Sequence, residues 1–310
     1  MAEMLLAIAP IFLLILLGHA LRRGGIPSLE FWNLNDKLVY WVLFPALLFY
    51  KMATLELTGS QVGEFALVIY GGFAAAMLFA LLSGRLVRLD APLWTSVVQG
   101  CTRHNTFIAL AVAERVYGVE GLVFAAVITA LLIPVTNVSV VATMVLLLRG
   151  RAEGSVFTAI LKDLARNPLL IAVLLGIVVN ASGISNIPIL FDMAKILGAA
   201  ALPIVLLCVG ANIRIRAMVY ATMATVLSIA GKMIVFPFVI GCIAIGVGLD
   251  QQATLVAMVF GAVPSAASAY TLARQMGGDA PAMAAIVTIQ TALSFLSLPL
   301  TLWVVEAWLS

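Results

Sequence analysis

The stretch VVQGCTRHNTFIAL, residues 97–110, carries a cluster of polar side chains inside otherwise apolar sequence. Arg103, His104 and Asn105 follow one another at its centre, and apolar runs extend from both of its ends. An arginine at the centre of a lipid bilayer costs at least about 2.5–3.5 kcal/mol on insertion scales, so it is expected to pair with an anion or to line water. The stretch therefore predicts an interrupted membrane-spanning helix.

The composition of the whole chain indicates an integral membrane protein. Hydrophobic residues make up 64% of the 310 residues and charged residues 10%, with a mean hydropathy of +1.16. Soluble proteins average about 45–50% apolar and about 25% charged residues. Apolar runs recur along the entire chain, so no large soluble domain is expected. The net charge of +3 gives no support for nucleic-acid binding.

Segmentation into apolar runs of about 20 residues, the length that crosses the hydrocarbon core, predicts ten spans. They cover residues 4–21, 33–50, 62–86, 94–116, 121–148, 168–181, 187–211, 218–247, 254–275 and 280–308. The first span is expected to be retained, because no basic region precedes it and it lacks a small-residue cleavage site. The connection at 150–167 has apolar residues at helical spacing, which predicts either an amphipathic cytoplasmic helix or an early start of the sixth span.

Basic residues in the connections indicate how these spans are oriented. With an external amino terminus, the opposite side of the membrane holds only two of them, Lys51 and Arg115. The cytoplasmic connections then hold eleven: Arg22, Arg23, Arg85, Arg88, Arg149, Arg151, Lys162, Arg166, Arg214, Arg216 and Arg274. Because cytoplasmic loops carry the excess of Lys and Arg, both termini are expected outside the cytoplasm.

The second half of the chain repeats features of the first half in the same order. Lys37 and Pro45 are eight residues apart in the second span, and Lys195 and Pro203 are eight apart in the seventh, at an offset of 158 residues. With five spans in each copy, the second copy must enter the membrane from the opposite side. This predicts two inverted five-helix repeats, an arrangement typical of secondary transporters. Chance similarity between apolar sequences is the alternative.

The fourth and ninth spans are the expected sites of helix interruption, at matching positions of the two repeats. Pro264, in the middle of the ninth span, has no amide hydrogen and clashes with the preceding turn, so carbonyls near Gly261 lose their usual partners. Asn105 matches Pro264 at an offset of 159 residues, in a stretch with glycine and polar residues but no proline. Two such breaks would bring free amide ends, which attract anions, and free carbonyl ends, which hold cations, to one place.

A substrate carboxylate is the expected partner of Arg103, because acidic residues are scarce inside the predicted spans. A guanidinium binds a carboxylate through two parallel hydrogen bonds. The alternative is that Arg103 caps free carbonyls in the break, or pairs with Glu64 or Glu114, for structure alone. Asn105 is expected to contact the same substrate.

Further polar residues are expected to line this site, although Ser and Thr also form ordinary hydrogen bonds between membrane helices. The expected lining residues are Asn137, Pro264, Ser265, Ser268, Gln290 and Thr291. His104 either titrates during transport or packs through a hydrogen bond. Lys232, near the middle of the eighth span, either stands in for a coupling ion as a built-in cation or neutralises a carboxylate. Cys101, Cys208 and Cys242 lack metal-site spacing, so no metal site is expected.

Seven segments together resemble the auxin efflux carrier family, in particular its bacterial branch that includes malonate transporters. They extend over almost the whole chain: LNDKLVYWVLFPALLF (34–49), QGCTRHNTFIAL (99–110), IPVTNV (133–138), NPLLIAVLLGIVV (167–179), ALPIVLLCVGANI (201–213), VPSAASAYTLARQMGGD (263–279) and TALSFLSLPL (291–300). Plant members have a proline at the fourth-span crossing, where this chain reads RHNT.

The resemblance implies a ten-helix fold related to bile-acid sodium symporters. Helices one, two, six and seven would form a scaffold domain, and helices three to five and eight to ten a transport domain in which helices four and nine cross at Asn105 and Pro264. It also implies elevator-like alternating access, a homodimer formed through the scaffold, and organic anions as substrates. In this scheme residues 1–149 are the first repeat, 150–167 a cytoplasmic connector and 168–310 the second repeat.

The sequence therefore predicts an all-α polytopic membrane protein that acts as a secondary active transporter of small carboxylates, such as malonate or auxin-like acids, in the bacterial inner membrane. No nucleotide-binding loop is present, so an ion gradient, with Na⁺ or H⁺ as coupling ion, or the membrane potential is expected to drive it, without an organic cofactor. A sodium/proton-type antiporter is the alternative, but none of Asp36, Asp192, Asp250 and Asp279 is expected near the crossing. An enzyme is not expected, because no nucleophile–base pair or metal cluster is found. Composition does not exclude a signalling receptor.

Overall fold

The computed structural model describes residues 2–54, 59–148, 165–184, 187–220 and 222–309. Within these ranges the chain forms helices joined by loops and contains no strand. Six helical segments are long and apolar enough to cross a membrane, and the shorter helix Pro168–Ala181 is apolar as well. The protein is therefore an all-helical, polytopic integral membrane protein.

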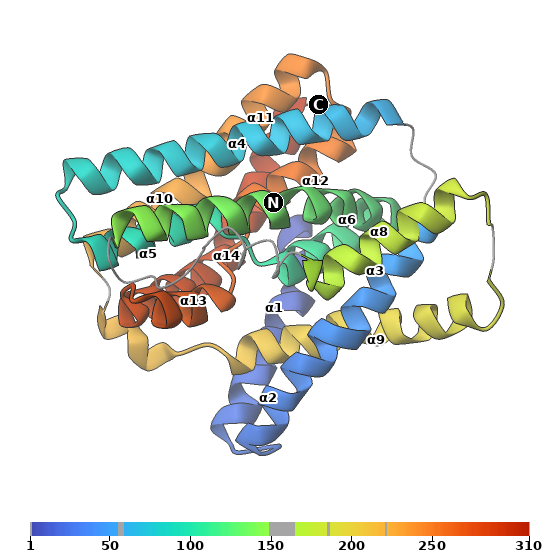
Figure 1. Ribbon diagram of the computed structural model, residues 1–310, viewed down its shortest axis with the longest axis horizontal. Helices are drawn as coiled ribbons and strands as arrows, with labels where there is room; N and C mark the ends of the chain where they lie inside the picture. The colour runs from blue at the N-terminus through green and yellow to red at the C-terminus, as the bar shows by residue number, and fades with distance from the viewer. Residues whose placement is uncertain (1, 55–58, 149–164, 185–186, 221, 310) are drawn as a thin grey trace.

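The helices follow one another closely along the chain (Figure 1). The first half contains α1 (Ala2–Arg23), α2 (Leu29–Leu38), the π-helical turn η1 (Val39–Leu43), α3 (Phe44–Ala53), α4 (Gly59–Leu86), α5 (Ala91–Thr102) and α6 (Thr106–Leu147). The second half contains α8 (Pro168–Ala181), α9 (Leu190–Ala211), the 3₁₀ turn η2 (Ile215–Tyr220), α10 (Met223–Ala230), the π-helical turn η3 (Gly231–Val235), α11 (Phe236–Val247), α12 (Gln251–Ala262), α13 (Ser268–Met276) and α14 (Ala280–Leu309).

Both π-helical turns lie directly before a Phe–Pro pair. Pro45 follows η1 at the start of α3, and Pro237 follows η3 at the start of α11. Proline cannot donate a hydrogen bond and its ring clashes with the carbonyl four residues earlier. A wider turn relieves this clash without ending the helix, which is a common cause of π bulges in long helices. The second of these turns carries Lys232.

The helices pack as two groups. In one group α9 packs against α1 and α3, and α3 also packs against α8. In the other, α11 packs against α4 and α12, α5 against α4 and α10, and α14 against α12 and α13, while α6 contacts members of both groups. A glycine allows α1 and α9 to pack closely, because a Cβ on Gly210 of α9 would overlap the carbonyl of Ile15 in α1. The two groups are joined through α6 and through the contact of α1 with α14.

The predicted span boundaries agree with the structure at two places. The boundary predicted between the fourth and fifth spans, at residues 117–120, coincides with a break inside α6, where Gly118 has non-helical backbone (φ 67°, ψ −152°). A positive φ with extended ψ is open to glycine and strained for other residues, so this glycine lets the chain turn without leaving the helical segment. The predicted sixth span, 168–181, has the same bounds as α8. The prediction for the connector at 150–167 falls largely on residues 149–164, outside the described residues.

Candidate functional site

The first helix interruption lies between α5 and α6. α5 ends at Thr102, and Arg103 has extended backbone (φ −72°, ψ 147°). α6 then begins at Thr106 with Asn105 as its N-cap, whose side-chain oxygen accepts hydrogen bonds from the amides of Phe107 and Ile108, both at 3.1 Å. An asparagine cap supplies the first free amides of a helix with an acceptor, so helix formation restarts here without a proline.

The second interruption lies between α12 and α13. α12 ends at Ala262, Val263 is extended (φ −65°, ψ 151°), and α13 begins at Ser268. In a continuous helix the residue at position 264 would donate to the carbonyl of Phe260, but proline has no amide hydrogen. Pro264 thus removes one of the bonds that would continue the helix, and the bonds of Asn105 and Ser265 hold the break as well.

The two interruptions meet and are joined by hydrogen bonds. The amide of Asn105 donates to the carbonyl of Pro264 at 2.8 Å, so the two residues that match in the sequence repeat are bonded to each other. The side chain of Gln290, fully buried on α14, donates to the carbonyls of Gly100 and Ser228 and accepts from the amide of Ser265, at 3.0, 3.0 and 2.9 Å. Backbone groups that leave regular helices inside a membrane protein are therefore satisfied by protein, as the absence of water demands.

Where the two interruptions cross, the carbonyl ends of α5 and α12 have different surroundings from the amide ends of α6 and α13. At the end of α5, buried side chains cap the free carbonyls: Gln290 donates to Gly100, and the Ser265 hydroxyl donates to Gln99, both at 3.0 Å. At the end of α12, Lys232 donates to the Phe260 carbonyl at 3.0 Å. The amide ends of α6 and α13 instead face a cavity of about 710 Å³, which Thr106 and Ser268 line. Helix amino termini carry a partial positive charge, so the open side of the crossing favours an anion.

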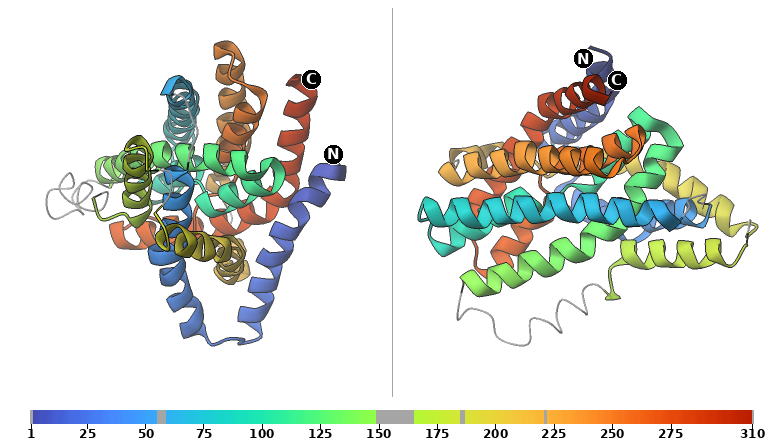
Figure 2. Two further views of the ribbon diagram at one scale, coloured as in Figure 1. Left: turned by 90° about the vertical axis from the view of Figure 1, so that its right-hand side faces the viewer. Right: turned by 90° about the horizontal axis from the view of Figure 1, so that it is seen from above.

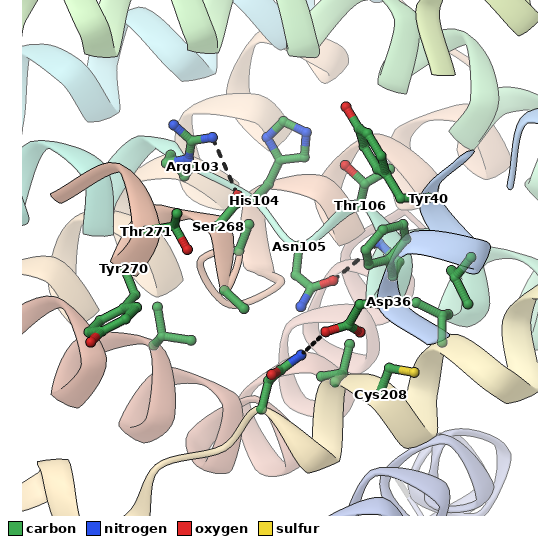
Figure 3. Close-up of a pocket in the computed structure, with 18 of the residues that line it drawn as sticks. Asp36, Tyr40, Arg103, His104, Asn105, Thr106, Cys208, Ser268, Tyr270 and Thr271 are labelled. Atoms are coloured by element: carbon green, nitrogen blue, oxygen red, sulfur yellow. Dashed lines mark hydrogen bonds between the residues drawn. The ribbon is translucent and has the colours of Figure 1, made fainter. Parts of the chain in front are cut away.

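The charged residues of this cavity give it a positive balance. Three basic residues line it, namely Lys37, Arg103 and Arg214, against one acidic residue, Asp36. Figure 3 shows Arg103 and Asp36 on different walls of the cavity, with Asn105 drawn between them. The formal balance is two positive charges, which a bound anion would reduce.

Arg103 has no carboxylate partner among the described residues. Its Nη2 donates to Asn137 Oδ1 at 3.3 Å and to Ser268 Oγ at 3.4 Å, both long bonds to neutral groups. Its Nη1 is buried without any hydrogen-bond partner in the described part of the chain. The two glutamates considered as partners lie elsewhere, because Glu64 is exposed on α4 and Glu114 lines a different cavity.

Other buried polar atoms on the wall of the cavity also lack partners. Both ring nitrogens of His104 and the hydroxyl of Thr136 make no hydrogen bond within the described residues. Buried polar groups are nearly always bonded, so each atom left without a partner indicates a place for water or a polar ligand. No group of three or more His, Cys, Asp or Glu side chains that could hold a metal ion occurs in the ranges described.

The structure brings together part of the predicted site. Five of the predicted residues line the cavity: Arg103, His104, Asn105, Asn137 and Ser268. The others lie away from it: Pro264, Ser265, Gln290, Thr291 and Lys232. Pro264, Ser265 and Gln290 take part in the hydrogen bonds that hold the crossing together, and the Thr291 hydroxyl donates to the Val287 carbonyl of its own helix at 2.7 Å. Substrate contact by any of these residues stays a prediction.

Asp36 corrects the sequence analysis, which expected no aspartate near the crossing. It lines the same cavity as Arg103, and its carboxylate accepts a hydrogen bond from Asn212 at 2.9 Å. Arg214 was likewise not foreseen in the site; its guanidinium stacks on the ring of Tyr270 at 3.8 Å. Asp36 and Arg214 lie near the ends of predicted spans, where the sequence predicts exposure to solvent. The tertiary fold brings these ends to the cavity.

A second cavity, of about 680 Å³, lies between α1, α3, α6 and α9. Its charged residues are Lys51, Glu114, Arg115 and Lys195. It shares no lining residue with the cavity at the crossing.

Comparison with known proteins identifies the family. A family model described as "Membrane transport protein" matches residues 4–303. The chain belongs to this family, the auxin efflux carriers. Among curated proteins, this chain is similar to an uncharacterized transporter of Methanothermobacter thermautotrophicus. The two are 24% identical over 298 residues, which cover 94% of each chain. This auxin efflux carrier family protein is therefore a membrane transport protein, and the family is one of transporters and not of enzymes.

Proposed function

We propose that the protein is a secondary active transporter of small organic anions, namely carboxylates such as malonate or auxin-like acids. The observation that carries the proposal is the unpaired guanidinium of Arg103, which faces a cavity together with two helix amino termini. Family membership supports transport, and the positive balance of the cavity supports an anion.

The proposed contacts follow from the atoms that lack partners. A substrate carboxylate accepts hydrogen bonds from Arg103, while Asn105, Asn137 and Ser268 surround it. Hydrogen bonds to charged groups contribute about 1.5–3 kcal/mol each. His104 and Thr136 lie on the same wall and contact the remainder of the substrate.

The proposed architecture is ten spans in two inverted repeats. Its support is the hydrogen bond between Asn105 and Pro264, which are matching positions of the two halves. The two chain ends, which an even number of spans places on one side, lie close together in both views of Figure 2. Residues 1–149 and 168–310 form the repeats; helices one, two, six and seven form the scaffold, and helices three to five and eight to ten the transport domain.

In the proposed cycle, the transport domain moves along the scaffold and exposes the crossing alternately to each side of the membrane. The cavity at the crossing opens between the two groups of helices, since its lining comes from both: Asp36 and Val205 from one, Ser268 and Thr288 from the other. The protein acts as a homodimer through its scaffold, in the inner membrane of a bacterium, with both termini outside the cytoplasm.

The driving force follows from the charge of the substrate. Moving one elementary charge across a membrane changes the free energy by about 2.3 kcal/mol per 100 mV. A negative cell interior expels anions, so an uncoupled carrier exports them. Import requires coupling to protons or sodium ions.

Uptake into proteoliposomes tests the proposal. Purified protein is reconstituted and supplied with radiolabelled malonate and a panel of other carboxylates, with a potassium diffusion potential of either sign. At least one carboxylate should accumulate on the positive side, and Arg103→Gln should lower its rate at least tenfold. Arg85→Gln, which removes the same charge from an exposed position on α4, should transport normally. Normal transport by Arg103→Gln, or transport of no carboxylate, would overturn the proposal.

A sodium/proton-type antiporter remains the second candidate because of Asp36. This carboxylate lines the cavity and is partly buried, and such groups bind and release cations in membrane proteins. The same proteoliposomes distinguish the two functions: an antiporter would dissipate a pH gradient on addition of sodium and would lose this activity in Asp36→Asn, without any carboxylate present.

A further inference from the structure

The carbonyl of Phe260 is the group that Pro264 leaves without its helical donor. The side chain of Lys232 fills this gap, because its Nζ donates to the Phe260 carbonyl at 3.0 Å. Phe260 lies in the last turn of α12, at the end with partial negative charge. The Lys232 side chain therefore caps the carbonyl end of an interrupted helix.

The surroundings of this ammonium contain no counter-ion. Lys232 is fully buried, with 0% of its surface exposed. Besides the carbonyl, its Nζ contacts the face of the Phe236 ring at 4.3 Å from the centroid. No carboxylate in the described part of the chain is hydrogen-bonded to it. A carbonyl oxygen and an aromatic face are both groups that attract a cation.

Carbonyls at the ends of interrupted helices are where transporters with inverted repeats coordinate their coupling cation. We infer that the Lys232 ammonium occupies this position permanently, so that the carbonyl end of α12 holds a cation that belongs to the chain and binds no sodium ion. The inference deepens the proposed function, since it concerns how that transport is driven. Carboxylate transport is then independent of sodium.

Two further observations fit a fixed cation. Cys101 of α5 and Gly231 of η3 are in contact, since a Cβ on Gly231 would overlap the Cys101 sulfur. The π-helical turn that carries Lys232 is therefore held against the first interrupted helix as well as against the second. Lys232 thus lies on a turn that packs against both broken helices, and it does not line the anion cavity.

The first test uses the unaltered protein. Carboxylate uptake and apparent melting temperature are compared in sodium, potassium and choline chloride at equal ionic strength. Equal uptake rates, within about twofold, and equal melting temperatures are expected. Uptake that requires sodium, or a melting temperature that rises with sodium alone, would overturn the inference.

The second test removes the cation and returns it as a small molecule. Lys232→Ala should lose at least tenfold in uptake and several degrees in melting temperature, and ethylammonium or sodium should restore part of both. Lys232→Met, which refills the space with an apolar chain, should lose uptake and respond to neither cation. Lys195→Ala, at an exposed lysine on α9, should behave as the unaltered protein.

These outcomes separate the inference from the proposed function. If ethylammonium restores the melting temperature of Lys232→Ala, the cation position is upheld, even if no carboxylate is transported. Absence of carboxylate transport would count only against the proposed function. Normal uptake by Lys232→Met would show that the lysine merely fills space and would overturn the inference. If neither variant can be purified, the sodium comparison on the unaltered protein decides.

Discussion

The two helix interruptions reach the same geometry by different routes. Between α12 and α13 the cause is local: Pro264 cannot donate, and Lys232 takes the carbonyl that it leaves free. Between α5 and α6 there is no proline, and the break depends on residues distant in sequence, because Gln290 of α14 takes the carbonyl of Gly100. The second break thus contains a proline, whereas the first has the local cap of Asn105 and a carbonyl that is held by the other half of the chain.

This difference teaches where the stability of the crossing resides. A break without a proline can close into continuous helix if its cap and its distant partners are lost, because every backbone amide there can then donate to the carbonyl four residues earlier. A break caused by proline would persist. The three substitutions below separate the two cases, in order of expected effect.

Gln290→Leu should have the largest effect on stability. It leaves two buried carbonyls and the buried amide of Ser265 without partners, and each such group costs about 1–3 kcal/mol. A loss of at least about 3 kcal/mol is expected, read as a drop of many degrees in apparent melting temperature in detergent. Thr291→Val is the matched control, because this neighbouring hydroxyl bonds only within its own helix. Equal melting temperatures for the two variants would contradict the role given to Gln290.

Asn105→Ala should cost less, about 0.5–2 kcal/mol, because it removes the cap of α6. Asn105→Asp keeps a capping oxygen and should retain most of that stability. It also places a negative charge at the cavity, so carboxylate affinity should fall at least tenfold while the melting temperature holds. An aspartate variant that binds carboxylates as the unaltered protein does would show that Asn105 does not face the anion.

Pro264→Ala should have the smallest effect, below about 1 kcal/mol. The new amide would point to a carbonyl that Lys232 already holds, and the break is also fixed by the bonds of Asn105 and Ser265. Melting temperature and uptake should both change little. A large loss of uptake at unchanged stability would mean that α12 and α13 had rejoined, and that the proline alone keeps them apart.

The helical, membrane-spanning character of the chain was predictable because the length of apolar runs reports directly on the membrane, whereas the ten spans and the orientation stay predictions. The break at Pro264 was predictable for the same kind of reason, since the missing amide is a property of one residue. Gln290 and Ser265 show the limit of this reasoning. In the sequence, a polar side chain that faces a ligand looks the same as one that caps a broken helix, because both are polar residues at the same depth in a span. Only the fold shows that Gln290 and Ser265 bond to backbone groups.

Asp36 shows a second limit. At the start of a span its carboxylate indicates an interface with water, and nothing in the local sequence places it beside Arg103 in one cavity. The tertiary fold brings the two residues to different walls of the same cavity. Arg103 itself was recognisable, because a lone basic residue inside an apolar segment is costly wherever it points.

The central claim is that the crossing presents an unpaired guanidinium and two helix amino termini to an anion. Calorimetric titration of the purified protein with malonate, or with the carboxylate that it transports best, tests this claim most directly when it is repeated with the neutral amide of the same acid and with Arg103→Gln. The account predicts that the acid binds at least ten times more tightly than the amide, and that Arg103→Gln removes this preference. Equal affinity for acid and amide, or an unchanged preference in Arg103→Gln, would contradict it.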